Sequence, residues 1–274
     1  MFPPKRIVCL TEETVETLYL LGEDHRIVGV SGYAVRPPQV RREKPRVSAF
    51  ISADIPKILA LEPDLVLTFS DLQAAIVADL IKAGVAVHAF NQRDVAGIFA
   101  MIRTLGALVG AAPKADELAT SLETRLSRLR DRTSRQNVKP RVYFEEWDDP
   151  MISGIRWVSE LIEIAGGVDV FPELSSRKSA PERVVSATDV IAVRPDIIMG
   201  SWCGKKFVPA KVAARDGFAT IPAVQNGWLR EIKSTIILQP GPAALTDGVD
   251  ALAQIVEEWS AAQGDARRDR MSAR

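Results

Sequence analysis

The chain has 274 residues, of which 47% are hydrophobic and 26% are charged, a composition typical of globular domains with room for more than one core. Basic and acidic residues both number 35, and this balance argues against a general nucleic-acid-binding protein. No stretch approaches the roughly 20 apolar residues of a membrane span. The two cysteines, Cys9 and Cys203, do not support a disulfide framework.

The first part of the chain alternates between predicted strands and helices. Short apolar runs bounded by turn residues predict the strands, and apolar residues at helical spacing predict the helices. We expect strands at 7–10, 27–30, 65–69 and 85–90, and helices at 15–21, 53–61, 71–83 and 94–110. Strict alternation of this kind favours a parallel sheet.

A long helix is predicted next, over residues 113–136. Leu118, Leu122, Leu126 and Leu129 recur at spacings that place them on one face of a helix. The alternation then resumes, with strands expected at 141–146, 196–200 and 228–232, and helices at 156–165, 186–193, 209–216 and 242–262. The second part of the chain therefore predicts a second parallel sheet.

Two stretches of the chain repeat each other. Residues 58–69 and 190–201 both carry an apolar helix end, a charged residue, Pro-Asp and a buried strand. Residues 5–10 and 140–145 form a second matching pair at nearly the same separation. The repeat predicts two similar α/β lobes with a ligand-binding cleft between them. We assign residues 1–111 to an N-terminal α/β lobe, 112–137 to a connecting helix, 138–262 to a C-terminal α/β lobe and 263–274 to a disordered tail.

The loops that follow the strands are the candidate ligand-binding segments, because ligands of parallel sheets bind beyond the carboxyl ends of the strands. Residues 145–157 hold two tryptophans, four carboxylates and an arginine, a mixture that suits a large flat ligand; the alternative is that one tryptophan packs under the helix. Residues 201–207 combine an aromatic side chain, a thiol and two lysines that would counter a negative group. The candidates from these loops are Arg36, Gln73, Asn91, Glu146, Trp147, Ser153, Arg156, Trp202, Cys203, Lys205 and Lys206.

Cys203 leaves an enzyme as the alternative function. Neighbouring Lys205 or Lys206 would lower the pKa of its thiol and let it act on a bound ligand, whereas an inert thiol explains the sequence equally well. A catalytic cysteine also needs a histidine base, and the two histidines, His25 and His88, fit structural positions better. Cysteines and histidines so far apart give no metal-site spacing, so we expect no metal and no resident cofactor. A protein-interaction module is the third alternative.

The repeated Pro-Asp strands, the long central helix and the segments 147–154 and 161–167 together resemble one family. It comprises the substrate-binding proteins of ABC importers for cobalamin, haem and ferric siderophores, and the cobalamin branch is the most similar. The resemblance implies two Rossmann-like lobes held by one backbone helix, with cobalamin or another corrinoid lying flat in the cleft and no catalysis. It also implies that Tyr33, Phe69 and Trp228 contact the ligand. Trp202 and Cys203 have no counterpart in the family pattern.

The resemblance also implies a partner, the ABC permease, which family members contact through an exposed glutamate on each lobe. The first-lobe position falls near Ala74 or Ala75, where this sequence has no acid. No signal peptide precedes the first strand, so we expect a cytoplasmic protein, or a periplasmic one if a leader precedes this sequence. The overall prediction is non-catalytic binding of a small corrinoid or related metal chelate, by a transporter component or a cytoplasmic relative of one.

Overall fold

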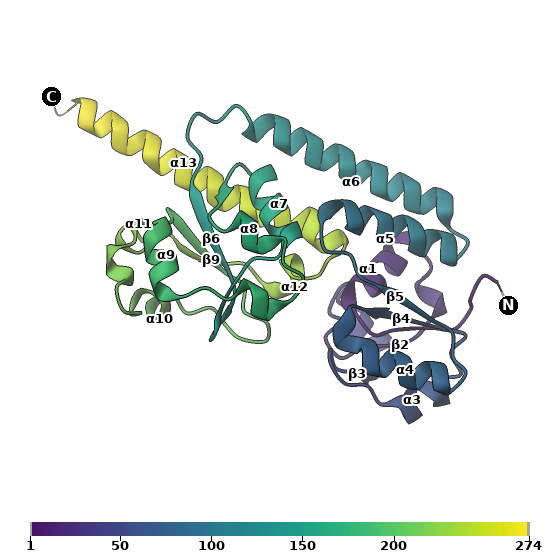
Figure 1. Ribbon diagram of the computed structural model, residues 1–274. Coiled ribbons are helices and arrows are strands. Elements are labelled where there is room, and N and C mark those ends of the chain that lie inside the picture. Colours follow the sequence, from purple (N-terminus) through teal and green to yellow (C-terminus); the bar gives the residue numbers. More distant parts are fainter. Residues whose placement is uncertain (1, 273–274) are drawn as a thin grey trace. The chain divides into compact units, whose positions relative to one another are not determined.

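The structure is a computed structural model that describes residues 2–272. The chain divides into two compact units (Figure 1). The first unit consists of Met1–Gln92, Ala96–Glu123 and Gln239–Ala243, and the second consists of Arg93–Val95, Thr124–Leu238 and Ala244–Arg274. No helix among residues 2–272 has both the length and the apolar character needed to cross a membrane.

The first unit is built on a parallel sheet in the order β3-β2-β1-β4-β5. Its core packs Val8, Leu10 and Val66 of the sheet against Ile58 and Leu80 of the covering helices. The strands are β1 (Ile7–Cys9), β2 (Ile27–Ser31), β3 (Arg46–Ser48), β4 (Leu65–Phe69) and β5 (Val87–Phe90). The helices are α1 (Glu12–Leu21), α2 (Val40–Glu43), α3 (Ile55–Ala60), α4 (Ala74–Lys82) and α5 (Val95–Leu108), with 3-10 turns η1 (Asp24–Arg26) and η2 (Asp71–Gln73). The predicted parallel sheet is confirmed, and β3 and α2 are additions to it.

The second unit is built on a mixed sheet in the order β10-β9-β6-β7, with β8 also paired to β6. Strand β7 runs antiparallel to β6, so the expectation of a wholly parallel sheet is wrong for this unit. Residues 145–157 are not a loop, as predicted, because β6 continues to Asp148. The chain then turns at Pro150, and the following strand β7 pairs with β6. The strands are β6 (Arg141–Asp148), β7 (Met151–Ser153), β8 (Val168–Asp169), β9 (Ile197–Gly200) and β10 (Leu229–Glu231).

Helices of the second unit include two that the sequence placed well, α7 and α9. The helices are α7 (Arg156–Ile164), α8 (Pro172–Ser175), α9 (Ala187–Val193), α10 (Pro209–Ala213), α11 (Pro222–Gln225), α12 (Ser234–Ile237) and α13 (Val249–Ser272), with shorter turns η3 (Ala180–Arg183), η4 (Phe218–Thr220) and the π-helical η5 (Ala244–Gly248). Helix α13 passes through most of the segment for which the sequence predicted a disordered tail, and residues 273–274 of that segment lie outside the described part.

The long central helix is α6 (Ala112–Thr133), and its residues are shared between the two units. Residues up to Glu123 belong to the first unit and those from Thr124 onward to the second. Within the second unit, Arg125 pairs with Asp250 and Arg132 pairs with Glu257 at 2.7 Å. These ion pairs fasten the end of α6 to α13, so the helix is anchored where it enters the second unit.

The repeated Pro-Asp motif of the first unit joins α3 to the amino end of β1. The Asp64 carboxylate accepts hydrogen bonds from the backbone N–H groups of Lys5 and Arg6, at 2.7 and 2.9 Å. The Arg6 guanidinium donates to the carbonyl of Leu61 just after α3. Glu62 takes a left-handed backbone conformation with φ of 46°, which turns the chain from the helix into the strand.

The second unit repeats this arrangement with the equivalent residues. The Asp196 carboxylate accepts from the backbone N–H of Arg141 at 2.9 Å, and the Arg141 guanidinium donates to the carbonyl of Val193 at the end of α9. Arg194 adopts a φ of 44°, matching the turn of the first unit. The sequence repeat is therefore also a repeat of hydrogen bonds, and it sits at the amino ends of both sheets.

Candidate functional site

The loops at the carboxyl ends of the strands are the candidate site, considered separately in each unit. We call the loops after β1, β2, β3, β4 and β5 the first-unit edge, and those after β6, β9 and β10 the second-unit edge. Open α/β sheets bind ligands at such edges because the connections there are free to vary and backbone groups point outward. The two edges differ sharply in chemistry.

Buried acids lie where β1 leads into α1 at the first-unit edge. Burial raises the pKa of Glu12 to about 7, and burial together with the charge of Glu12 raises the pKa of Glu13 to about 8. The hydroxyl of Thr11 donates a 2.6 Å hydrogen bond to the Glu13 carboxyl group. Burial thus favours the protonated form of both carboxyl groups, which sets them apart from ordinary surface glutamates.

A returning segment of the chain, Gln239–Ala243, is held against this edge within the first unit. The Gln92 side chain donates to the carbonyl of Pro240 at 2.9 Å, and the backbone N–H of Ala243 donates to the Glu16 carboxylate at 3.0 Å. These two hydrogen bonds join the returning segment to residues that follow β5 and lie on α1 of the same unit.

Predicted residues of the first-unit edge fall into an exposed group and a buried group. Tyr33 is 54% exposed, and two further apolar side chains of these loops, Ile51 and Leu72, are 70% and 59% exposed. Asn91 is exposed as well. Arg36 is partly exposed and pairs with Glu16 at 3.0 Å. The exposed apolar groups follow β2, β3 and β4, three strands of one sheet, and give this edge an apolar character.

Phe69 and Gln73 belong to the buried group. Phe69 is 6% exposed, and Gln73 has no exposed surface. The Gln73 amide accepts from the backbone N–H of Phe69 and donates to the carbonyls of Leu10 and Phe50. The Gln73 side chain therefore links the loops after β1, β3 and β4 by hydrogen bonds and stabilises their conformation.

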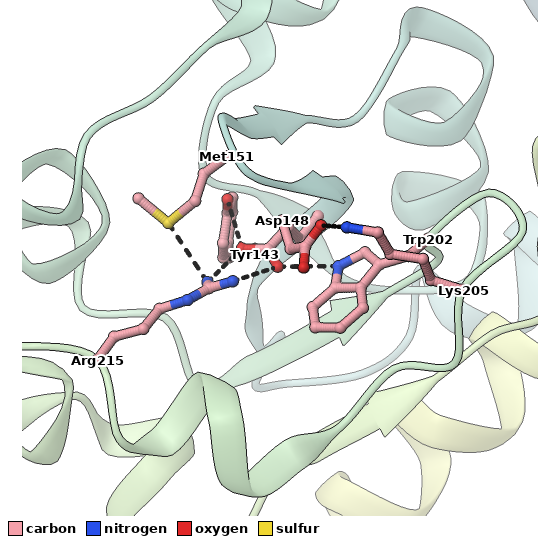
Figure 2. A network of polar contacts seen from close by, with 7 residues as sticks. Tyr143, Asp148, Met151, Trp202, Lys205 and Arg215 are labelled. Atoms are coloured by element: carbon pink, nitrogen blue, oxygen red, sulfur yellow. Dashed lines mark hydrogen bonds and ion pairs between the residues drawn. The ribbon is translucent and has the colours of Figure 1, made fainter.

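The second-unit edge is organised around Glu145, which is fully buried on β6. Figure 2 shows the side chains of Arg215, Trp202 and Tyr143 in the polar network that surrounds it. Arg215 donates to both of its carboxylate oxygens, at 2.5 and 2.9 Å. The indole N–H of Trp202 and the hydroxyl of Tyr143 also donate to it, at 3.0 and 3.1 Å. Burial and the neighbouring carboxylate hold the pKa of Tyr143 well above its usual value. This network fixes the indole of Trp202, which is 5% exposed.

Trp147 and Asp148 end β6 and meet the side chain of Lys205. The Lys205 ammonium lies 2.6 Å from an Asp148 oxygen and 4.1 Å from the centroid of the Trp147 ring. The Trp147 indole N–H donates to the carbonyl of Asp149. Partial burial raises the pKa of Asp148, but hydrogen bonds from Lys205 and the backbone, together with the charges of Lys205 and Arg215, outweigh burial, so the pKa is lowered overall. Two predicted residues, Trp147 and Lys205, are thus in direct contact.

Glu146 and Ser153 meet at a buried arginine. Arg183 is 2% exposed; it donates to both Glu146 oxygens, at 2.6 and 3.1 Å, and to the carbonyl of Ser153. The hydroxyl of Ser153 donates to the carbonyl of Arg183. These contacts pin the short β7 against η3, so Glu146 and Ser153 are engaged in holding the hairpin in place.

Arg156 and Trp157 begin α7. Arg156 is exposed and contacts Asp94 at 3.6 Å and Glu160 at 3.0 Å. Trp157 is 4% exposed, and its indole N–H donates to the carbonyl of Ile237. The alternative reading, in which a tryptophan packs under the helix, is therefore correct for Trp157.

The remaining predicted residues of the second unit occupy two different settings. Trp228 lies at the amino end of β10, with Arg230 over its ring at 4.6 Å, so the structure does not bring it to the second-unit edge. Cys203 and Lys206 are both exposed in the loop after β9. That loop is anchored by Phe207, which is 1% exposed and packs edge-on against Trp202.

Sequence reasoning missed Arg215 and Arg183, and it missed the buried roles of Glu13 and Glu145. Arg215 and Arg183 are single arginines in otherwise ordinary stretches, and their partners lie 70 and 37 residues away along the chain. Only the burial of Glu145 inside an apolar strand could have hinted at a cationic partner. Among the described residues, no group of three or more histidines, cysteines, aspartates or glutamates is arranged to hold a metal ion.

Comparison with known proteins finds one family and several similar structures. Residues 7–236 match the sequence profile of the family described as periplasmic binding protein. The vitamin B12-binding protein of Vibrio cholerae is 26% identical, over 96% of this chain and 91% of its own length. An uncharacterized ABC transporter substrate-binding lipoprotein, YvrC of Bacillus subtilis, is 27% identical, over 92% of this chain and 80% of its own length.

Solved structures show the same fold. The periplasmic vitamin B12-binding protein BtuF of Vibrio cholerae superimposes with a TM-score of 0.75 and 25% identity, over 94% of this chain and 98% of that one. The periplasmic heme-binding protein RhuT from Roseiflexus has a TM-score of 0.78 at 23% identity, over 92% of this chain and 99% of that one. The predicted two-lobed α/β architecture is confirmed.

Proposed function

This chain belongs to the periplasmic binding protein family, whose members carry ligands without converting them, and we propose that it binds a corrinoid or a related metal chelate. The observation that carries the proposal is the similarity to a vitamin B12-binding protein along 96% of the chain, with a BtuF structure of matching fold. The alternative in which Cys203 acts as a nucleophile has no support in this family.

Both edges offer surfaces that suit such a ligand. The first-unit edge exposes Tyr33, Ile51 and Leu72, apolar groups that can cover one part of a large ring system. The second-unit edge presents the indole of Trp147 beside charged groups that can orient polar substituents. The buried residues Gln73 and Glu145 hold these loops rigid, which lowers the entropic cost of binding.

Calorimetric titration with cyanocobalamin, cobinamide and haemin, accompanied by absorbance spectra, tests the proposal. Dissociation constants in the micromolar range or below for a corrinoid or for haemin support it. Tyr33→Ala and Trp147→Leu should each weaken binding roughly tenfold, since loss of one aromatic contact removes about 1.4 kcal/mol. Lys211→Ala, on the exposed surface of α10, is the matched control and should leave affinity unchanged. Absence of binding by all three compounds would refute the proposal.

We further propose that the protein serves an ABC permease from the periplasmic side of the membrane. The family and the substrate-binding lipoprotein among its relatives support this choice over the cytoplasmic alternative. Cell fractionation with an antibody against the native protein distinguishes the two locations. The permease contact near Ala74 and Ala75, where the sequence has no acid, can be tested by cross-linking from Ala75→Cys in membranes that contain the transporter.

A further inference from the structure

We propose that Trp147 and Asp148 form a recognition site for a positively charged group, an ammonium or quaternary ammonium, and that the Lys205 ammonium competes with such a group for this site. The proposal goes beyond the proposed function, because it assigns a positive charge to the part of the ligand that meets the second-unit edge. It rests on the proposed function only in taking that edge as a ligand-binding surface.

The contacts of Lys205 are those that a cationic ligand would make. Its ammonium is hydrogen-bonded to Asp148 at 2.6 Å and stands 4.1 Å from the centre of the Trp147 ring. A carboxylate beside an aromatic face attracts a cation by charge and by the quadrupole of the ring together. The hydrogen bond and charge of Lys205 help to lower the pKa of Asp148, so a cation at this position favours the ionised carboxylate.

The Trp147 ring is oriented independently of Lys205. Its indole N–H donates to the carbonyl of Asp149 at 2.9 Å, and Trp147 packs against the core cluster of the second unit. Trp147 and Asp148 also pair with Ile152 and Met151 across the β6–β7 hairpin. The two recognition groups therefore remain in place if the ammonium leaves.

Lys205 is in turn free to leave, because other residues hold its loop. Trp202 is buried and bonded to Glu145, and Phe207 is buried with its backbone N–H donating to Glu231. The Lys205 side chain is 45% exposed, so its ammonium can move into water at small cost. Lys205 thus acts as an internal competitor that a better cation displaces.

Titration of the ¹⁵N-labelled chain with tetramethylammonium chloride at constant ionic strength tests the proposal. The readout is the indole N–H resonance of Trp147, assigned through Trp147→Leu. Lys205→Met removes the competitor and should lower the dissociation constant at least tenfold, equivalent to about 1.4 kcal/mol. Lys205→Gln repeats the measurement with a polar side chain, and Lys211→Met is the control that should match the wild-type protein. Neutral tert-butanol, of similar shape, should not bind.

Adding Asp148→Asn to Lys205→Met should abolish the gain. Equal affinities of the wild-type protein and Lys205→Met for tetramethylammonium, or no response from either, would overturn the proposal. The test is separate from the corrinoid titration. Tetramethylammonium binding without corrinoid or haemin binding would refute the proposed function and support this site. Corrinoid or haemin binding without tetramethylammonium binding would support the proposed function and overturn this site.

Discussion

Replacing Arg215 by alanine should strongly destabilise the second unit. The change leaves the Glu145 carboxylate buried with no cation, although Trp202 and Tyr143 still donate to it. Removing one partner of a buried ion pair costs about 3–5 kcal/mol. The Arg215 side chain is 19% exposed, so water can enter the space it leaves, and we expect a loss near the lower limit, about 3 kcal/mol.

Urea unfolding followed by tryptophan fluorescence measures this loss. All five tryptophans of the sequence lie in the second unit, so the signal reports that unit alone. With a denaturant slope of about 2 kcal/mol per molar, a 3 kcal/mol loss moves the urea midpoint down by about 1.5 M. Lys211→Ala, four residues away on the exposed surface of α10, is the control and should shift it little.

A second variant separates the charge from the lost packing. In Glu145→Gln/Arg215→Met both charges are gone, while the amide oxygen can still accept from Trp202. This double variant should be more stable than Arg215→Ala, since no uncompensated charge is buried. If Arg215→Ala loses less than about 1 kcal/mol, or if the double variant is the weaker of the two, then the buried carboxylate is not the source of the effect and our reasoning fails.

Three further predictions concern the first unit and the repeated motif. Asp64→Ala and Asp196→Ala should each cost about 0.5–1.5 kcal/mol, because each removes a carboxylate that accepts from backbone N–H groups at the amino end of a sheet, two for Asp64 and one for Asp196. Urea unfolding measures both losses, with tryptophan fluorescence following the second unit and circular dichroism following the whole chain. A neutral effect of either variant would contradict the equivalence of the repeats. Burial raises the pKa of Glu13 to about 8 in the folded chain, against an ordinary value of 4.5. As pH rises, the Glu13 carboxyl group therefore loses its proton in the unfolded chain before it does so in the folded chain. The free energy of unfolding should fall between about pH 5 and 8, by at most about 1.4 kcal/mol per pH unit. Glu13→Gln should flatten this decline in melting temperature, and an unchanged profile would show that Glu13 is not responsible. Gly241→Ala should destabilise the first unit by about 1–3 kcal/mol, because the added Cβ would stand 2.5 Å from the Cβ of Glu13. Gly264→Ala is the control, since no atom lies within 4 Å of its added Cβ, and its melting temperature should be unchanged or slightly raised.

The regular elements could be predicted from local sequence because their signals are local. The apolar run that predicted a strand at 65–69 is β4, Leu65–Phe69, and the helix predicted to end at residue 21 is α1, which Gly22 ends in a left-handed conformation. The short β7 was missed because three residues carry too little periodicity to show a strand. Its antiparallel pairing depends on the turn at Pro150 and on contacts with distant Arg183.

The candidate site was harder to predict because its side chains are placed by tertiary contacts. Residue type and loop position led to Trp147 and Lys205, which do meet at the second-unit edge. The same reasoning also selected Gln73 and Ser153, whose buried hydrogen bonds hold loops in shape. The local sequence does not distinguish a polar side chain that faces a ligand from one that forms hydrogen bonds to the backbone. No feature of the sequence around Arg215 indicated its role.

The two units are alike at the amino ends of their sheets and differ at the carboxyl ends. At the amino ends, Asp64 and Asp196 make equivalent hydrogen bonds to the first strand of each sheet. At the carboxyl ends, the first unit exposes apolar groups such as Tyr33, while the second presents Trp147 among charges. The two edges therefore differ in surface chemistry although the scaffold of the two units is shared. Under the proposed function, Tyr33→Ala and Trp147→Leu should weaken corrinoid binding with additive free energies, because the two residues share no partner; a double variant no weaker than either single variant would contradict this.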